Sequence, residues 1–454
     1  MKSIERNTMR IYDLANPIRK HWNWAGDGFR PHAYDDRLPE SIIVYPKHGF
    51  THVDAPCHMV RGGKTTDDCA LSQLCGEAAL IDISDCVPAK PVTAELLESR
   101  GYEVRRGDIV ILRSNLANKF PNTSADYWIK SPYVDSSGAR WLVERGLSAL
   151  VIDFPQDYPA REMGDRDVAN EEWIEHQIVL GSGLMHLEHV RGLDAIQERR
   201  VFLFGWPIKI PSCDGGPARP IALAEWPKGI PSIIDMSITL DEGWRNTVRI
   251  MRSKTFNVGD PVQETGFSWL GHSHTHVVMP SYVTGLHSDG IDAINDEHLE
   301  AVCNWVHVAD LRANISSKII TAASLEAATE GVSTTQILLL HTGYADHTAY
   351  CSPDWLNHSP SLSTEAADWL IAKGFKTIAL DFELDAATRA HNKGLLTEAQ
   401  LPIEARLLRS GVILIKNVCG ASKLIGRRAF MAAAPLRVPH AESAPARAMA
   451  VYWE

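Results

Sequence analysis

Short runs of Val, Ile and Leu alternate along the chain with segments of helical periodicity. Three runs in the first half, 41–45, 109–113 and 149–154, have the composition and length of buried strands. Apolar residues recur at helical spacing in 137–145 and 170–180, and a glycine follows each segment, as is common where helices end. The alternation predicts an α/β domain with a well-covered sheet.

A long internal repeat relates the two halves of the chain. The segment 139–157 is echoed by 367–385 with a constant offset of 228 residues. Upstream, His52 corresponds to His276 with an offset of 224, so one length difference of four residues separates the two registers. A register shared over more than forty residues is not expected by chance, and it indicates a duplication.

Two tandem copies of one domain of about 200 residues follow from this repeat. We expect the first copy to occupy residues 1–222 and the second to occupy residues 223–454. The stretch 211–231 is rich in Pro and Gly, a composition typical of connections, and we expect the copies to be joined there.

Composition narrows the class of protein. With 45% apolar and 22% charged residues the chain is typical of globular proteins, and its net charge of -11 includes no basic stripe for nucleic acid. No apolar run approaches the roughly 20 residues that span a bilayer, and the first residues contain no apolar signal core. We therefore expect a soluble, cytoplasmic protein whose partners include neither nucleic acid nor membrane.

The eight cysteines form no C-x-x-C pair. This spacing predicts neither a disulfide scaffold nor a structural zinc knuckle, and buried, reduced thiols are the simpler interpretation. Cys57 lies within a cluster of histidines, where a thiolate ligand to a metal is the alternative.

The sequence HGFTHVDAPCH carries the clearest chemistry. It places four polar side chains at even separations: His48, His52, Asp54 and His58. In an extended chain, side chains two apart share a face, whereas a helix would spread them around its axis. A straight strand would hold His48 and His52 about 13 Å apart, too far to share one ion. The segment must therefore bend, and Gly49 and Pro56 permit or mark such a bend.

Two imidazoles and a carboxylate suit Zn²⁺ or Mn²⁺ and leave coordination positions for water and substrate, as a catalytic site requires. An ion held there acidifies a bound water molecule toward neutrality. His58 then suits the role of general base, because imidazole titrates near neutral pH. A hydrogen-bonded polar strand face without metal is the alternative.

The segment resembles the H-x-G-T-H-x-D-x-P-x-H signature of the cyclase-like metal-dependent hydrolases, a family that includes bacterial kynurenine formamidase and isatin hydrolase. Phe50 stands where the signature has glycine. This departure removes no ligand but narrows the expected pocket, and it makes Phe50 a candidate for contact with substrate. The resemblance also implies a mixed β/β/α fold of the swivelling type in both halves.

The formamidase branch completes its site with a histidine and, twelve residues later, a glutamate. His176 and Glu188 have this spacing. The resemblance implies a first ion on His48, His52 and Asp54, and a second on Asp54, His176 and Glu188, with Glu188 as a candidate bridge. Whether one or two ions bind stays open. It makes His58 the residue that transfers protons.

Trp24 begins the sequence WAGD, which resembles the W-P-G-D stretch whose tryptophan contacts substrate in the formamidases. The resemblance therefore makes Trp24 a candidate pocket wall. Core packing is the alternative for this side chain.

The second copy has lost most of this set. In chain order the six residues become His272, His276, Val278, Tyr282, Glu404 and Lys416. Valine offers no lone pair, and an ammonium repels a cation. We hypothesise that Lys416, paired with Glu404, supplies the charge that a metal supplies in the first copy. The sequence thus predicts one working site and one supporting domain.

The leading prediction is a metal-dependent hydrolase that cleaves a small amide, an N-formyl amide, a cyclic amide or a lactone. A lyase or cyclase that uses the same metal is one alternative, and a non-catalytic metal-dependent binding protein is another. The sequence favours neither zinc nor manganese. Family members pair as homodimers, which implies an intramolecular pseudo-dimer here and leaves further homo-oligomerisation open.

Overall fold

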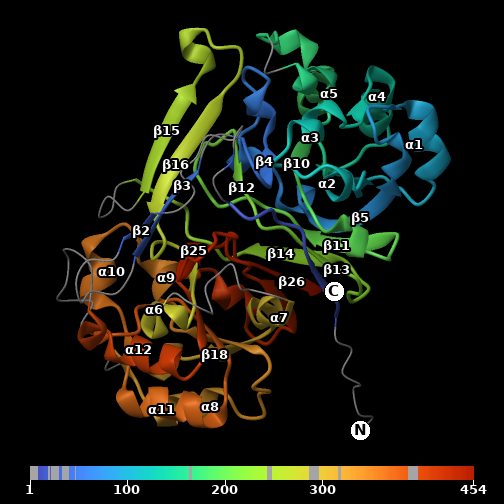
Figure 1. The fold of residues 1–454 in the computed structure, drawn as a ribbon. Helices are drawn as coiled ribbons and strands as arrows, with labels where there is room; N and C mark the ends of the chain where they lie inside the picture. The colour runs from blue at the N-terminus through green and yellow to red at the C-terminus, as the bar shows by residue number, and fades with distance from the viewer. Residues whose placement is uncertain are drawn as a thin grey trace.

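Two nine-stranded sheets with the same strand order form the framework of the chain (Figure 1). The computed structural model describes residues 9–18, 21, 30–32, 40–45, 48–162, 166–242, 248–285, 296–314, 318–386 and 397–454. This architecture confirms the predicted α/β class and the two tandem copies of one domain.

In order of hydrogen-bonded neighbours, the first sheet contains β1 (Ile11–Asp13), β13 (Ile221–Leu223), β11 (Arg200–Phe204), β5 (Cys75–Asp82), β7 (Ile109–Arg113), β9 (Ala149–Ile152), β10 (Met185–Glu188), β4 (His52–Asp54) and β12 (Gly215–Pro217). The second contains β14 (Pro231–Asp235), β26 (Met449–Trp453), β24 (Ala429–Ala432), β18 (Cys303–Asp310), β20 (Ile337–His341), β22 (Thr377–Leu380), β23 (Ile413–Lys416), β17 (His276–Val278) and β25 (Ser443–Pro445). In the first sheet β5, β7, β9 and β10 run parallel to one another. Strand β4 runs antiparallel to β10, and β12 runs antiparallel to β4. The strand predicted at 109–113 is β7, and the one predicted at 149–154 is β9.

Most helices lie on the outer side of each sheet, whereas α7 (Asp296–Val302) also contacts β1 of the first copy (Figure 1). Those of the first copy are α1 (Ala94–Arg100), α2 (Leu116–Lys119), α3 (Ala125–Ile129), α4 (Ser136–Glu144) and α5 (Ile174–Val179). Those of the second copy are α6 (Ser281–Thr284), α7 (Asp296–Val302), α8 (Ala322–Ala328), α9 (Tyr344–His347), α10 (Pro353–His358), α11 (Thr364–Lys373) and α12 (Pro402–Arg409). Small parallel pairs join β6 (Pro91–Val92) to β8 (Tyr133–Val134), and β19 (Ile319–Ile320) to β21 (Ser361–Leu362).

The repeat extends to the helix caps. The Asp135 carboxylate accepts a hydrogen bond from the backbone N–H of Gly138 at the start of α4, and the Ser363 hydroxyl does the same for Ala366 in α11. Side-chain caps of this kind satisfy backbone donors that the first helical turn leaves unpaired. The two caps are 228 residues apart, which is the register read from the sequence.

The two copies pack together through matching contacts. Arg219 Nη1 donates to the backbone oxygen of Pro435 at 3.0 Å, and Arg447 Nη1 donates to that of Pro207 at the same distance. The second contact repeats the first with the copies exchanged, because each pair of equivalents differs by 228. One hydrophobic core includes buried residues of both copies. The halves therefore form an intramolecular pseudo-dimer.

A third sheet joins one hairpin from each copy. Its order is β15 (Val248–Lys254), β16 (Glu264–Leu270), β3 (Glu40–Tyr45) and β2 (Arg30–His32). The segment 41–45 is thus a strand as predicted, but it pairs antiparallel with β16 of the second copy. In Figure 1 the β15–β16 hairpin leaves the second copy and extends beside the first.

The expected connection at 211–231 contains two strands of the first sheet. Strands β12 and β13 lie within it, so only residues 224–230 separate the two nine-stranded sheets. Gly215 is small because β12 runs against β4, where an added Cβ would lie 2.1 Å from the Val53 oxygen. Glycine therefore marks a close approach of two strands in this stretch. The division at 222/223 falls inside β13 and stays a prediction.

Among the described residues, no helix has the length and apolar character needed to cross a membrane.

Candidate active site

The histidine segment bends, as its spacing requires. Strand β4 is only three residues long, and a 3₁₀ turn begins at Pro56. The bend is at Phe50, whose φ is +55°, and not at Gly49. A left-handed backbone costs glycine little, which explains why the family signature has glycine where this chain has Phe50. The matching residue of the second copy, His274, has a φ of +56°.

Neighbouring strands bring the two predicted ligand groups together. Strand β4 pairs antiparallel with β10, so that Asp54 lies opposite His186, and His52 opposite Glu188. Alternation places these four side chains on one face of the sheet. The predicted helix 170–180 is interrupted at Trp173, and His176 lies on the shorter helix α5.

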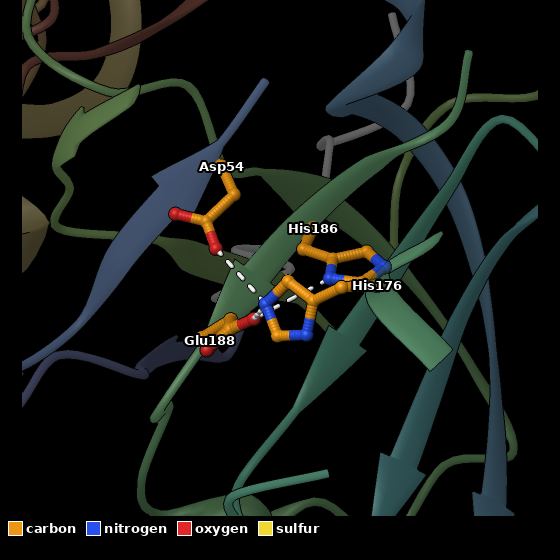
Figure 2. A group of neighbouring side chains, drawn as sticks. All are labelled: Asp54, His176, His186 and Glu188. Carbon is orange, nitrogen blue, oxygen red and sulfur yellow. Dashed lines mark hydrogen bonds and ion pairs between the residues drawn. The ribbon is translucent and has the colours of Figure 1, made fainter. Parts of the chain in front are cut away.

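Asp54 lies between two sets of donors. Its Oδ1 atom is 3.2 Å from His52 Nε2 and also contacts His48 Nδ1. Its other oxygen, Oδ2, is 3.6 Å from His176 Nε2, which lies 3.2 Å from Glu188 Oε1 (Figure 2). A carboxylate placed this way has one oxygen for each of two neighbouring cations.

His58 stacks on His48 with 3.7 Å between ring centroids. The structure thus brings together all six side chains predicted as ligands or base. Phe50 is buried, with its ring edge-on to His21. Trp24 lies outside the described residues.

Each of the four histidines of this site has an acceptor for one ring nitrogen. The acceptors are Phe50 O for His52 Nδ1 at 3.0 Å, Gln263 O for His58 Nδ1 at 2.7 Å, Asp214 Oδ2 for His48 Nε2 at 2.7 Å and Asp157 Oδ2 for His176 Nδ1 at 2.6 Å. Metal-binding histidines typically donate their second N–H to a backbone oxygen or carboxylate in this way.

The electrostatics favour a cation. Burial by itself raises the pKa of Asp54, but the charges of His48 and His52 outweigh it and hold this pKa well below its usual range. Burial lowers the pKa of His48, but the carboxylates of Asp54 and Asp214 outweigh burial and hold this pKa well above its usual range. Asp54 therefore stays ionised.

The residues present fit a divalent ion. His52 Nε2 is buried and has no hydrogen-bond partner among the described residues, although its ring donates through Nδ1. The Nε2 lone pair of His52 is therefore available to a metal ion. Together with a second imidazole and a carboxylate, it forms a donor set that suits Zn²⁺ or Mn²⁺. Cys57 is a free thiol whose pKa burial raises to about 12, so it is not a thiolate at neutral pH.

Sequence reasoning missed several residues around this site. Asp214 precedes β12, and the hydroxyl of Thr265 donates to its Oδ1 atom. Gln263 and Thr265 belong to the second copy, so no local pattern near residue 50 indicates them. His186 could have been found, because it precedes Glu188 by two residues and therefore shares its strand face.

The second copy retains only part of the arrangement. Lys416 Nζ lies 2.7 Å from Glu404 Oε2, which confirms the pairing hypothesised from the register. His272 Nε2 lies 3.4 Å from Glu442, the equivalent of Asp214. Among the described residues, every group of three or more ligand-type side chains close enough to share an ion lies in the first copy.

The profile of the Cyclase family, described as "Putative cyclase", matches residues 12–156 and 234–385, more than half of the chain. The chain belongs to the cyclase family. One matched segment lies in each copy of the domain.

Relatives of known name are about half as long as this cyclase-family chain. The kynurenine formamidase of Bacillus mycoides (strain KBAB4) is 27% identical over 226 residues, which cover 47% of this chain and 97% of the relative. That of Bacillus anthracis is 25% identical with the same coverage. Isatin hydrolase A from Labrenzia aggregata, solved with benzyl benzoate, has a TM-score of 0.41 and 22% identity, covering 47% of this chain and 93% of its own. A potential metal-dependent hydrolase with cyclase activity has a TM-score of 0.39 and 23% identity, covering 48% of this chain and all of its own.

Proposed function

We propose that this protein is a metal-dependent hydrolase that cleaves a small amide, an N-formyl amide, a cyclic amide or a lactone in its first copy. The observation that carries the proposal is the buried position of Asp54, which presents one oxygen to each of two histidine-containing groups. The names of the relatives, kynurenine formamidase and isatin hydrolase, support hydrolysis of an amide bond.

The metal ligands in this proposal are His48, His52 and Asp54 for one ion, and Asp54, His176 and Glu188 for a second. Either zinc or manganese suits these donors. When bound, such an ion polarises the substrate carbonyl and lowers the pKa of a water molecule.

His58 is the general base in this proposal. Its Nδ1 atom lies 2.7 Å from the backbone oxygen of Gln263, which can only accept, so Nδ1 carries the hydrogen. The lone pair of Nε2 then accepts the proton of the attacking water, and His58 delivers this proton to the leaving group. Phe50 and Trp24 remain the candidate substrate contacts.

The two copies divide the work. Residues 1–222 form the catalytic unit in this proposal, and residues 223–454 support it through the hairpin that carries Gln263 and Thr265. We place the protein in the cytoplasm with a small-molecule substrate, and with neither nucleic acid nor a membrane as a partner.

A hydrolysis screen of N-formyl aryl amines, cyclic amides and lactones, run with and without chelator, tests the proposal. We expect turnover that chelator abolishes and added metal restores. Reaction in ¹⁸O-labelled water should place one solvent oxygen in the product acid. Product without solvent oxygen would favour the lyase or cyclase alternative, and ligand binding without turnover would favour the binding protein.

A further inference from the structure

A second buried pair lies against the ligands of the first copy. His186 and Glu175 are both fully buried, and the imidazole stands in β10 opposite Asp54. His186 precedes Glu188 by two residues, so both side chains point to the same face of the sheet. His186 therefore faces the group that we assign to the second ion.

The two ring nitrogens of His186 face different carboxylates. Nδ1 lies 3.3 Å from Glu188 Oε1, whereas Nε2 lies 3.2 Å from Glu175 Oε1. Figure 2 shows the imidazole beside His176 and Glu188. One ligand atom from each of four side chains lies within 4.8 Å of the others: Asp54, His176, His186 and Glu188.

The second copy shows what this position needs for packing alone. In its registers His186 becomes Leu414, and Glu175 becomes Ile403. Leu414 pairs with Val278 in the same place where His186 pairs with Asp54, and all three apolar side chains are buried. Aliphatic residues thus fill the position in the copy that has lost the metal ligands. Burying an imidazole and a carboxylate costs desolvation energy that packing does not require.

We propose that His186 is a fourth protein ligand of the second ion, and that Glu175 orients it. In this assignment Nδ1 is the ligating atom, and Nε2, which lies 3.2 Å from Glu175 Oε1, carries the hydrogen that faces this carboxylate. A carboxylate beside the second ring nitrogen is common around metal-binding histidines. The assignment rests on the two-ion site of the proposed function. It gives the second ion four protein donors, the number typical of a structural site, and leaves the open positions of a catalytic site to the ion on His48 and His52.

Metal titration of the metal-free full-length chain tests the assignment without reference to turnover. The informative variant is Glu175→Ile/His186→Leu, which transplants the residues of the second copy and should fold because that copy packs them. We expect the wild-type chain to bind two Zn²⁺ ions. The double variant should bind one of these ions at least a hundredfold more weakly and the other with unchanged affinity.

The single variant Glu175→Gln should lower the affinity for the same ion by about tenfold or more, the usual effect of removing an outer partner of a ligating histidine. His341→Leu is the matched control, because His341 is also a fully buried imidazole, paired with Asp381 in the second copy. It should leave both affinities unchanged.

Co²⁺ spectra separate ligation from positioning. Loss of an imidazole ligand should change the visible bands of the Co²⁺-loaded protein in Glu175→Ile/His186→Leu. Wild-type affinity for both ions in this variant would overturn the proposal, and so would weaker binding with an unchanged Co²⁺ spectrum. A wild-type chain that binds fewer than two ions would overturn the two-ion site itself, which is a separate result.

Discussion

Lys416 and Glu404 form a buried ion pair in which Nζ lies 2.7 Å from Oε2. They occupy the registers of Glu188 and His176, so the pair stands where the first copy has ligands. Burial by itself lowers the pKa of Lys416, but the charges of Glu404 and Glu383 outweigh it and raise this pKa above its usual value. The second copy therefore keeps a permanent internal cation.

Replacing Lys416 alone should destabilise the protein. Lys416→Met leaves Glu404 buried without its partner, a change that typically costs about 3–5 kcal/mol. The double variant Lys416→Met/Glu404→Leu should recover most of this loss, because a hydrophobic pair of similar volume is often neutral. Denaturant unfolding measures both values. Equal stability of the single and double variants would contradict this account.

Asp54→Ala should abolish metal binding and activity with little change in the fold. Asp54 faces both donor groups, because its Oδ1 lies 3.2 Å from His52 Nε2 and its Oδ2 lies 3.6 Å from His176 Nε2. Metal analysis and circular dichroism check the two parts. A full metal complement in Asp54→Ala would refute the two-ion assignment.

His58→Ala should lower turnover by roughly a hundredfold or more while metal remains bound, the usual scale for loss of a general base. Metal content and kcat are measured on the same sample. His48, Asp54 and His58 also lie close enough to share an ion. Loss of metal from His58→Ala would therefore make His58 a ligand and assign proton transfer to another group.

Asp214→Asn should lower the affinity for the first ion or the activity by about 10–100-fold, the range for an outer carboxylate that orients a ligating histidine. Asp214 accepts from His48 and holds a hydrogen bond from Thr265 of the second copy. Thr265→Val should act in the same direction with a smaller effect, and Thr265→Ser should restore wild-type behaviour. Metal affinity and kcat/KM provide the readouts, and wild-type values in Asp214→Asn would exclude an orienting role.

The second copy should be catalytically silent but structurally required. His272→Ala/His276→Ala should leave turnover nearly unchanged, because the second copy cannot hold two metal ions bridged by a carboxylate. A chain that ends at Ala224 keeps β13 but loses Gln263 and the interface, so it should be insoluble, inactive or driven to dimerise. Solubility, light scattering and kcat test both variants. A fully active monomer of the first copy, or a large loss in the double alanine variant, would contradict the division of roles.

The sequence by itself determined the duplication, the metal motif and the loss of that motif in the second copy. These features are local or depend on a constant register. The spacing of His48, His52 and Asp54 can therefore be read directly, and so can the presence of Lys416 at the position equivalent to Glu188. Strands such as 109–113 were also predictable, because a buried strand is a short apolar run.

Tertiary structure alone decided which distant residues complete the site. Gln263 and Thr265 reach the first copy only because β16 pairs with β3 across about 220 residues of sequence. The left-handed backbone at Phe50 and the sheet hidden in 211–231 depend on neighbouring strands that no local pattern encodes. Local periodicity sets which elements form, whereas the burial of two matching faces against each other sets which side chains meet.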